Sequence, residues 1–217
     1  MPLEDIQNER IKKLSLLFES KRDPYPARVK RSRQISEALK NFSNFSDKKN
    51  KLSIAGRVMA KREHGRAMFL DIKDYSGRIQ AYFKEDILKK SYDDAVSFLD
   101  IGDFISVTGR SFKTKRNEKT IEVKNWQMLA KTLRPLPEKR EGLQDVEERY
   151  RKHYLDLLMN DKTMSRFKTR SGVVYFLRDL LAKDGFMEVE TPILQPIPGG
   201  AEAQPFVTHH NALDVDF

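Results

Sequence analysis

Three neighbouring stretches of the chain carry an aromatic ring, an amide and several cations at positions that strand alternation places on one face. In residues 67–72 the aliphatic residues Met68, Leu70 and Ile72 alternate and can face a core, so Phe69 is predicted to point outward. The same alternation over residues 78–83 turns Gln80 outward. The outward side chains predicted for the three stretches are Arg57, Lys61, Phe69, Arg78, Gln80 and Tyr82.

This combination of side chains suits single-stranded nucleic acid. The ring of Phe69 can stack on an unpaired base. The amide of Gln80 can donate and accept at one base edge, and arginine and lysine can hold phosphates. The alternative is that Phe69 packs beneath a neighbouring loop or domain. The sequence therefore predicts a nucleic-acid interface, with a packing role for Phe69 as the alternative.

The elements that would position these side chains are predicted strands around one helix. Period-two patterns predict strands at 51–62, 66–73, 78–84, 103–113 and 119–129. Residues 85–99 have helical spacing instead. Five strands with a helix between the third and fourth are the order of an OB-fold barrel, in which Gly56 and Gly109 would allow bulges or sharp bends.

The flanking segments are predicted to be mainly helical, which makes the fold class α+β. Helices are predicted before the barrel at 3–20 and 34–42, with a polar connector at 43–50. Prolines and charges mark a hinge at 133–150. Beyond it, the patterns predict helices at 147–159 and 163–184, a strand at 186–190 and a last strand-like stretch from 205 that reaches the end without a turn signal.

Charge is distributed unevenly along the chain. The net charge is +9, but residues 1–132 hold 29 Lys+Arg against 18 Asp+Glu, whereas residues 133–217 hold 12 against 14. A basic part beside a nearly neutral one indicates that the first part binds a polyanion. The alternative is a basic surface without a specific partner, and a charged N-terminal helix face is more often solvated than bound to RNA.

Several classes of protein are disfavoured by composition. The chain has no Cys, which excludes disulfides and thiolate metal sites and fits a cytoplasmic location. The first residues lack the apolar region of a signal peptide, and no apolar run approaches the ~20 residues of a membrane span. His209 and His210 would point to opposite faces of a strand, so no metal site is predicted there.

The segment AGRVMAKREHGRAMFLDIKDYSGRIQAYF (55–83) resembles the anticodon-binding barrel of the class II synthetases for lysine, aspartate and asparagine. The resemblance implies that Phe69 stacks on the central anticodon base while Arg62 and Gln80 read its edges. KTKRNEKTIEV (113–123) resembles the lysyl members, in which a glutamate matching Glu118 contacts a neighbouring base. Strict alternation would turn Arg62 inward, so its role requires a bulge or a strand end nearby.

The later segments are also similar to lysyl-tRNA synthetases. RPLPEKREGLQDVEERYRKHYLDL (134–157) resembles the segment that joins the barrel to the catalytic core. GFMEVETPILQPIPGGAEAQPFVTHHNALD (185–214) resembles class II motif 1 and the following loop. The resemblance implies that Pro192 lies in a dimer interface and that Gly200 and Ala201 approach the amino-acid substrate. Gln204 stands where bacterial relatives usually have an arginine, which puts one structural contact in doubt.

The chain is thus identified as a member of the class II lysyl-tRNA synthetases, from the N-terminus through motif 1. The implied domains are an N-terminal helical extension (1–50), an OB-fold anticodon-binding domain (51–132), a hinge (133–150) and the truncated start of an antiparallel-sheet catalytic domain (151–217). The implied reaction is ATP- and Mg²⁺-dependent adenylation of lysine and transfer to lysine tRNA, whose anticodon is U-rich, by a cytoplasmic homodimer without a membrane anchor.

The resemblance also implies that the groups for ATP, Mg²⁺ and the lysine ammonium lie beyond Phe217. No catalytic residue is therefore expected in this chain, and the chain alone is expected to be inactive. One alternative is a non-catalytic OB-fold RNA-binding fragment or paralogue. An aspartyl or asparaginyl enzyme is disfavoured by the GGAEAQPF loop, and lysyl-like enzymes that modify other proteins are disfavoured because they lack the barrel.

Overall fold

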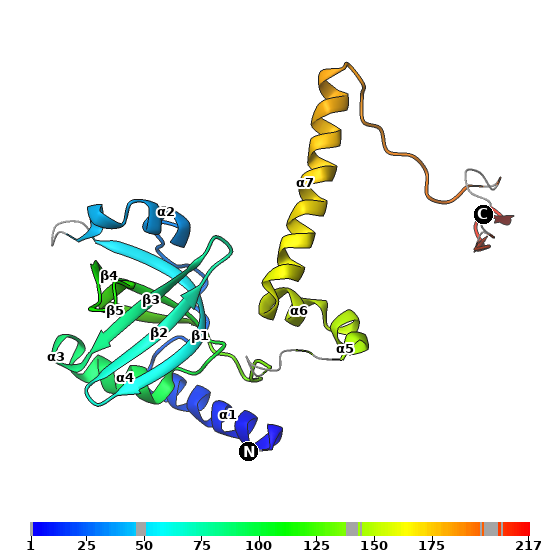
Figure 1. Cartoon of the computed structure of the whole chain (residues 1–217). Coiled ribbons are helices and arrows are strands. Elements are labelled where there is room, and N and C mark those ends of the chain that lie inside the picture. The colour runs from blue at the N-terminus through cyan, green and yellow to red at the C-terminus, as the bar shows by residue number, and fades with distance from the viewer. Residues whose placement is uncertain are drawn as a thin grey trace. The chain divides into compact units, whose positions relative to one another are not determined.

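The computed structural model describes residues 2–46, 51–137, 143, 145–195, 197, 204 and 206–217. The chain forms two compact units, Met1–Glu141 and Gly142–Phe217. The first unit contains the barrel together with the N-terminal helices. The second unit is mainly helical (Figure 1).

The first unit is built on a closed five-stranded barrel, which confirms the predicted strands. The strands are β1 (Leu52–His64), β2 (Ala67–Lys73), β3 (Arg78–Lys84), β4 (Phe104–Lys113) and β5 (Lys119–Ala130). Their order around the barrel is β1-β2-β3-β5-β4 (Figure 1). Strands β3 and β5 pair in parallel, whereas the other strand pairs of the barrel are antiparallel.

The barrel core follows the predicted alternation along β2 and β3. Met68 and Leu70 of β2 are fully buried, as are Ala81 and Phe83 of β3. Each buried aliphatic or aromatic side chain of this kind contributes about 1.5–3 kcal/mol to folding. Gly109 lies at a register shift between β4 and β5, where an added Cβ would lie 2.0 Å from a backbone oxygen. The predicted need for glycine in this strand is therefore confirmed.

A β-bulge in β1 reverses the side-chain alternation along its second half. Val58 pairs with Ile72 of β2 and Ala60 pairs with the next residue, Asp71, so the register shifts by one residue between them. Beyond this bulge Lys61 lies opposite core-facing Leu70. The predicted outward position of Lys61 was therefore wrong, because strict alternation was assumed through the bulge.

The N-terminal helices belong to the barrel's hydrophobic core. They are α1 (Leu3–Glu19), α2 (Ile35–Lys40) and the 3-10 helix η1 (Phe42–Phe45), so residues 43–45 are helical where a connector was predicted. Leu17 and Ile35 are fully buried in the barrel cluster. The guanidinium of Arg10 donates to the backbone oxygens of Ile101 and Thr132, which fixes α1 to the barrel.

The single helix predicted at 85–99 is two helices, α3 (Glu85–Leu88) and α4 (Lys90–Phe98). Lys89 separates them in a left-handed backbone conformation with φ 50°. The break allows both Leu88 of α3 and Tyr92 of α4 to reach the core. Helical periodicity alone could not locate this break, because the apolar spacing continues across it.

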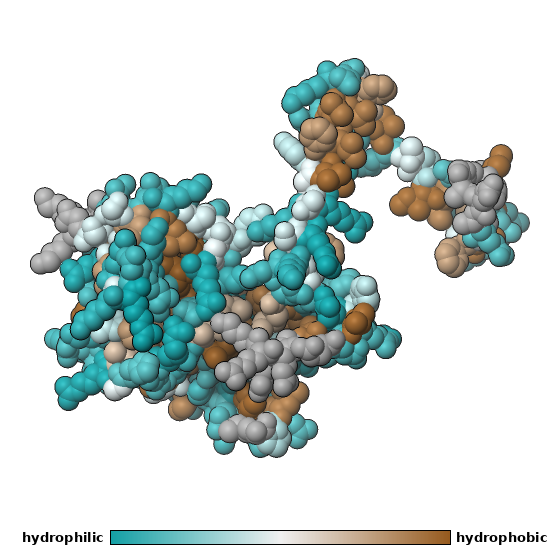
Figure 2. Space-filling model, viewed as in Figure 1, coloured by the Kyte–Doolittle hydropathy of each residue, from teal (hydrophilic) through white to brown (hydrophobic). Residues whose placement is uncertain are grey.

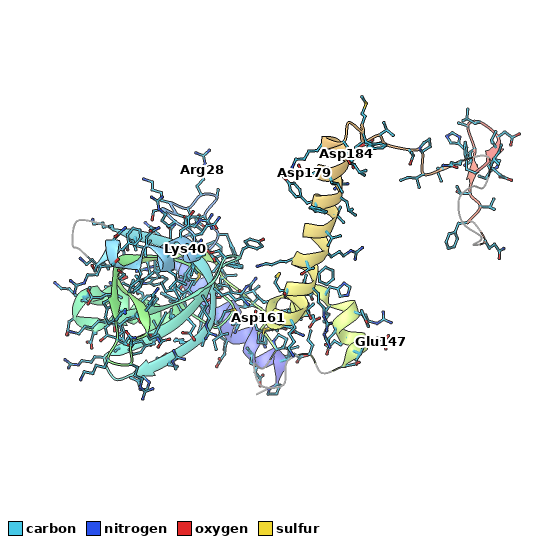
Figure 3. The ribbon with its side chains drawn as sticks, turned by 45° about the horizontal axis from the view of Figure 1, so that its top comes forward. Arg28, Lys40, Glu147, Asp161, Asp179 and Asp184 are labelled. Atoms are coloured by element: carbon cyan, nitrogen blue, oxygen red, sulfur yellow. The ribbon has the colours of Figure 1, made fainter. Side chains whose placement is uncertain are left out.

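The second unit contains α5 (Val146–Arg151), α6 (His153–Met159), α7 (Asp161–Lys183) and the short strands β6 (His209–His210) and β7 (Val215–Asp216). The predicted helix 147–159 is divided at Lys152, which has ψ 51°. Asp156 joins the three helices, since it accepts from Arg149 of α5 and from the Thr163 hydroxyl of α7. In Figure 3, Asp161 marks the first residue of α7 and Asp184 marks its C-terminal end.

Two strand predictions in the second unit were wrong. Residues 186–190 are not a strand, and within the described residues of this unit the one strand pair is β6 with β7. A strand requires a neighbour for its backbone hydrogen bonds. The stretch after 205 was predicted to lack a turn, but residues 211–214 form one between β6 and β7, with Asp214 at φ 51°.

The C-terminal half of α7 exposes many large apolar side chains. Figure 2 shows apolar side chains gathered over this part of the helix. The exposed large apolar side chains are Val173, Val174, Tyr175, Phe176, Leu177, Leu180 and Leu181. Large exposed apolar patches of this kind are typical of surfaces that contact other structure. No helix in the described part of the chain combines the length and apolar character needed to cross a membrane.

Candidate nucleic-acid interface

A cavity of about 620 Å³ opens on the outer face of the barrel. It collects side chains from β1, β2 and β3 and from the turn between β4 and β5. The lining residues are Arg62, His64, Phe69, Gln80, Thr114, Lys115, Arg116 and Glu118. All four residues that the resemblance assigned to the anticodon therefore line one cavity, whose volume is within the ordinary range for small-ligand sites.

Phe69 provides the aromatic surface of the cavity. It is half-buried, and it lies opposite Tyr82 of β3 in the strand register. The two rings are stacked, with centroids 4.8 Å apart, and the His64 ring meets Phe69 edge-on at 6.4 Å. These neighbours hold the Phe69 ring in a fixed orientation, which is what a base-stacking surface requires.

Gln80 lies on the same outer face, but it is only 6% exposed. Its Nε2 donates to a carboxylate oxygen of Glu118 at 2.8 Å, and its Oε1 accepts from the Thr120 hydroxyl at 2.9 Å. The prediction that Gln80 shares a face with Phe69 is confirmed, whereas its predicted exposure is wrong. The turn that carries Glu118 covers it.

Arg62 reaches the outer face because of the bulge in β1. It lies opposite Phe69 in the strand register, so the bulge that its predicted role required is present. Its side chain is 48% exposed, and its guanidinium donates to Asp71 at 3.3 Å. Asp71 is nearly buried and also accepts from Arg78. One carboxylate therefore orients two guanidinium groups beside the cavity.

Two of the predicted phosphate-binding cations are engaged elsewhere. Arg57 donates to the backbone oxygen of Gly102, and its guanidinium carbon lies 4.1 Å from the centroid of the Phe104 ring. Burial lowers the pKa of Arg57, and nearby Asp103 partly offsets that effect. Lys61 donates to the backbone oxygens of Val96 and Leu99 at the end of α4. Arg57 points outward as predicted, because it precedes the bulge, whereas the outward position predicted for Lys61 was wrong; neither cation lines the cavity.

Lys115 and Arg116 supply cations at the cavity instead. Both are exposed on the turn between β4 and β5, where Asn117 adopts φ 62°. The sequence analysis did not identify these two residues as part of the interface. Two adjacent cations at a hairpin turn, next to the glutamate of the anticodon motif, were the signal that could have identified them.

The other predicted site residues lie in the second unit. Pro192 is exposed, and its backbone oxygen accepts from the Gln195 amide. Gly200 and Ala201 lie outside the described residues. The His209 ring contacts Asp216, and His210 accepts from the backbone N–H of Leu213. Among the residues that the structure describes, no group of three or more His, Cys, Asp or Glu could hold a metal ion.

Two protein families match the chain along its length. The family described as OB-fold nucleic acid binding domain matches residues 52–129, which contain the cavity. The family described as tRNA synthetases class II (D, K and N) matches residues 145–217. An OB-fold barrel followed by this sequence is the combination found in a class II tRNA synthetase of the D, K and N group.

Curated relatives narrow the assignment within that group. The chain is 47% identical over 213 residues to a lysine–tRNA ligase of Carboxydothermus hydrogenoformans, which covers 98% of this chain and 43% of the relative. It is 45% identical to a lysine–tRNA ligase of Clostridium novyi, over 96% of this chain and 41% of the relative. It is 42% identical to one of Oceanobacillus iheyensis, over 94% of this chain and 42% of the relative. The chain is thus similar over nearly its whole length to lysine–tRNA ligases and spans about two fifths of the length of these relatives.

Proposed function

We propose that this chain supplies the anticodon-binding part of a lysine–tRNA ligase, which attaches lysine to its tRNA through lysyl-adenylate. The observation that carries the proposal is the cavity in which Phe69, Gln80, Arg62 and Glu118 meet. Stacking on Phe69 would supply base affinity, at about 1–3 kcal/mol per base. The polar groups around it would select the base, because they meet its hydrogen-bonding edge.

The same cavity would hold the RNA backbone through the cations at its rim. Lys115, Arg116 and Arg62 are exposed where the RNA strand would leave the cavity. The excess of positive charge in residues 1–132 supports a polyanionic partner. Phosphate contacts of this kind carry no base information, so they would add affinity without selecting a sequence.

We further propose that ATP and Mg²⁺ serve the adenylation step of the whole enzyme. When bound, they would activate the lysine carboxylate by adenylation. Because the chain spans about two fifths of the length of its relatives, we expect no lysine-dependent ATP–pyrophosphate exchange from this chain alone. The Gly200–Ala201 loop would approach the lysine substrate.

The second unit is proposed to form part of a homodimer interface. The exposed apolar surface of α7 supports this, because large exposed apolar patches mark interaction sites. Pro192 follows that helix in the chain, and the neighbouring Ile193 is 97% exposed. A cytoplasmic location is proposed with this function and fits a chain without cysteine.

The function is tested by titrating the chain against labelled anticodon stem-loops and following fluorescence anisotropy. One loop carries the U-rich lysine anticodon, and a second has the same stem with cytosine at the central anticodon position. Tighter binding of the U-rich loop is expected at a fixed salt concentration. Equal affinity for the two loops would contradict base reading and leave a general single-strand binder.

A further inference from the structure

The amide of Gln80 is held at both ends by partners of opposite hydrogen-bonding character. Its Nε2 lies 2.8 Å from the Glu118 carboxylate and its Oε1 lies 2.9 Å from the Thr120 hydroxyl. Thr120 is completely buried, and it lies opposite Gln80 in the parallel pair of β3 and β5. The strand pairing therefore holds the hydroxyl beneath the amide.

These two partners permit only one orientation of the amide. An ionised carboxylate only accepts hydrogen bonds, so Glu118 must face the N–H group of Gln80. The amide oxygen then points to Thr120, whose hydroxyl can donate to it. A rotated amide would place its oxygen against the carboxylate and leave two acceptors facing each other. The backbone oxygen of Glu118 lies 3.2 Å from the same hydroxyl, farther than Gln80 Oε1 at 2.9 Å, so the single hydroxyl hydrogen is directed mainly to Gln80.

The consequence concerns what the cavity can offer to a base. The Oε1 of Gln80 points to the buried Thr120 hydroxyl, whereas Nε2 has a second N–H to donate. Glu118, which is exposed and lines the same cavity, offers an acceptor beside it. The polar wall of the cavity therefore presents a donor next to an acceptor.

We propose that Thr120 is a positioning residue that makes this cavity selective for bases with a keto oxygen beside an imino proton. Uracil and guanine have that pattern, since the oxygen can accept from Gln80 while the ring N–H donates to Glu118. Cytosine and adenine present an amino group beside a bare ring nitrogen. They would place donor against donor and acceptor against acceptor. The proposal rests on the proposed function, because it requires that the cavity hold a base.

The test compares bases of equal size in stem-loops that differ only at the central anticodon position. The full chain is titrated against loops with uracil or cytosine, and against loops with guanine or adenine. The wild type is expected to prefer the keto base within each pair. Thr120→Val keeps the side-chain shape but removes the donor. We expect it to reduce the uracil-to-cytosine preference about tenfold, which corresponds to ~1.4 kcal/mol.

Two variants separate positioning from a general loss of structure. Thr120→Ser retains the hydroxyl and is expected to keep the preference. Thr108→Val removes a hydroxyl that contacts Ser53 on β1, away from the cavity, and should leave both preferences unchanged. Unfolding of each variant is followed by the fluorescence of Trp126, the single tryptophan of the chain, which is buried in the first unit.

The possible failures are distinct. If the wild type binds all four loops equally, base reading fails and the proposed function fails with it. If the wild type discriminates but Thr120→Val retains the full preference, the positioning role is wrong while the function stands. Loss of the preference in Thr120→Ser, or a guanine loop bound no better than the adenine loop, would also overturn the proposal.

Discussion

Removal of the Phe69 ring tests the stacking surface on which the proposed interface depends. Phe69 is half-buried and lies outside the barrel's hydrophobic core cluster, so Phe69→Ala should leave the fold intact. Its stacking on Tyr82 at 4.8 Å contributes about 0.5–1.5 kcal/mol to folding, a small part of a typical stability of about 5–15 kcal/mol. The loss of one stacked base should cost about 1–3 kcal/mol of binding, or about 5- to 150-fold in Kd.

The assay is the anisotropy titration with the U-rich stem-loop at fixed salt. Phe18→Ala is the matched control, because Phe18 is an exposed phenylalanine on α1 and does not line the cavity. Trp126 fluorescence confirms that the first unit of each variant is folded. Wild-type affinity in a folded Phe69→Ala variant would refute the stacking role, as would an equal loss of affinity in Phe18→Ala.

Three further predictions concern the charges of the first unit. Lys131→Met should lower the free energy of unfolding of this unit by about 3–5 kcal/mol, because it leaves fully buried Asp103 without its counter-ion. Denaturant unfolding followed by Trp126 fluorescence measures the loss, and an unchanged denaturant midpoint would contradict the prediction. Burial tends to raise the pKa of Asp100, but hydrogen bonds from Lys13 and Lys131 lower it below its usual 3.8. The ionised Asp100 therefore contributes to the free energy of unfolding above that value, and this contribution is lost as pH falls through the folded-state pKa. Asp100→Asn should therefore flatten the acid side of the stability profile, and an equally steep profile would refute the assignment. Replacing Lys115 and Arg116 by Gln should weaken the binding of the uracil and cytosine loops alike. It should also reduce the slope of log Kd against log salt concentration by about 0.7 for each phosphate that the variant no longer binds. An unchanged slope would show that these two cations do not bind phosphates.

The barrel could be predicted from sequence because its signal is local. Alternation along β2 and β3 identified both the core side chains and the face that carries Phe69 and Gln80. Side-chain orientation along β1 could not be predicted in the same way. A single bulge after Val58 moves each following side chain to the opposite face of the strand. The bulge itself depends on how β1 pairs with β2. The positions of Lys61 and Arg62 are therefore set by tertiary structure.

The contacts of individual polar groups were equally inaccessible to sequence reasoning. Arg57 and Lys61 were expected to meet phosphates, but backbone oxygens near the end of α4 lie within their reach. The burial of Gln80 and its bond to Thr120 arise because β3 and β5 pair in parallel across the barrel closure. That pairing joins residues 40 positions apart in the sequence, and no local pattern signals it.

The most direct test of the central claim is a photo-crosslink from the central anticodon position. A stem-loop with 5-iodouridine at that position is bound to the full chain, irradiated and digested with trypsin, and the crosslinked peptide is identified by mass spectrometry. The account predicts a crosslink at Phe69, in the peptide of residues 67–73 that follows cleavage after Arg66 and Lys73. A crosslink confined to any other peptide would show that the base does not stack in this cavity and would contradict the account.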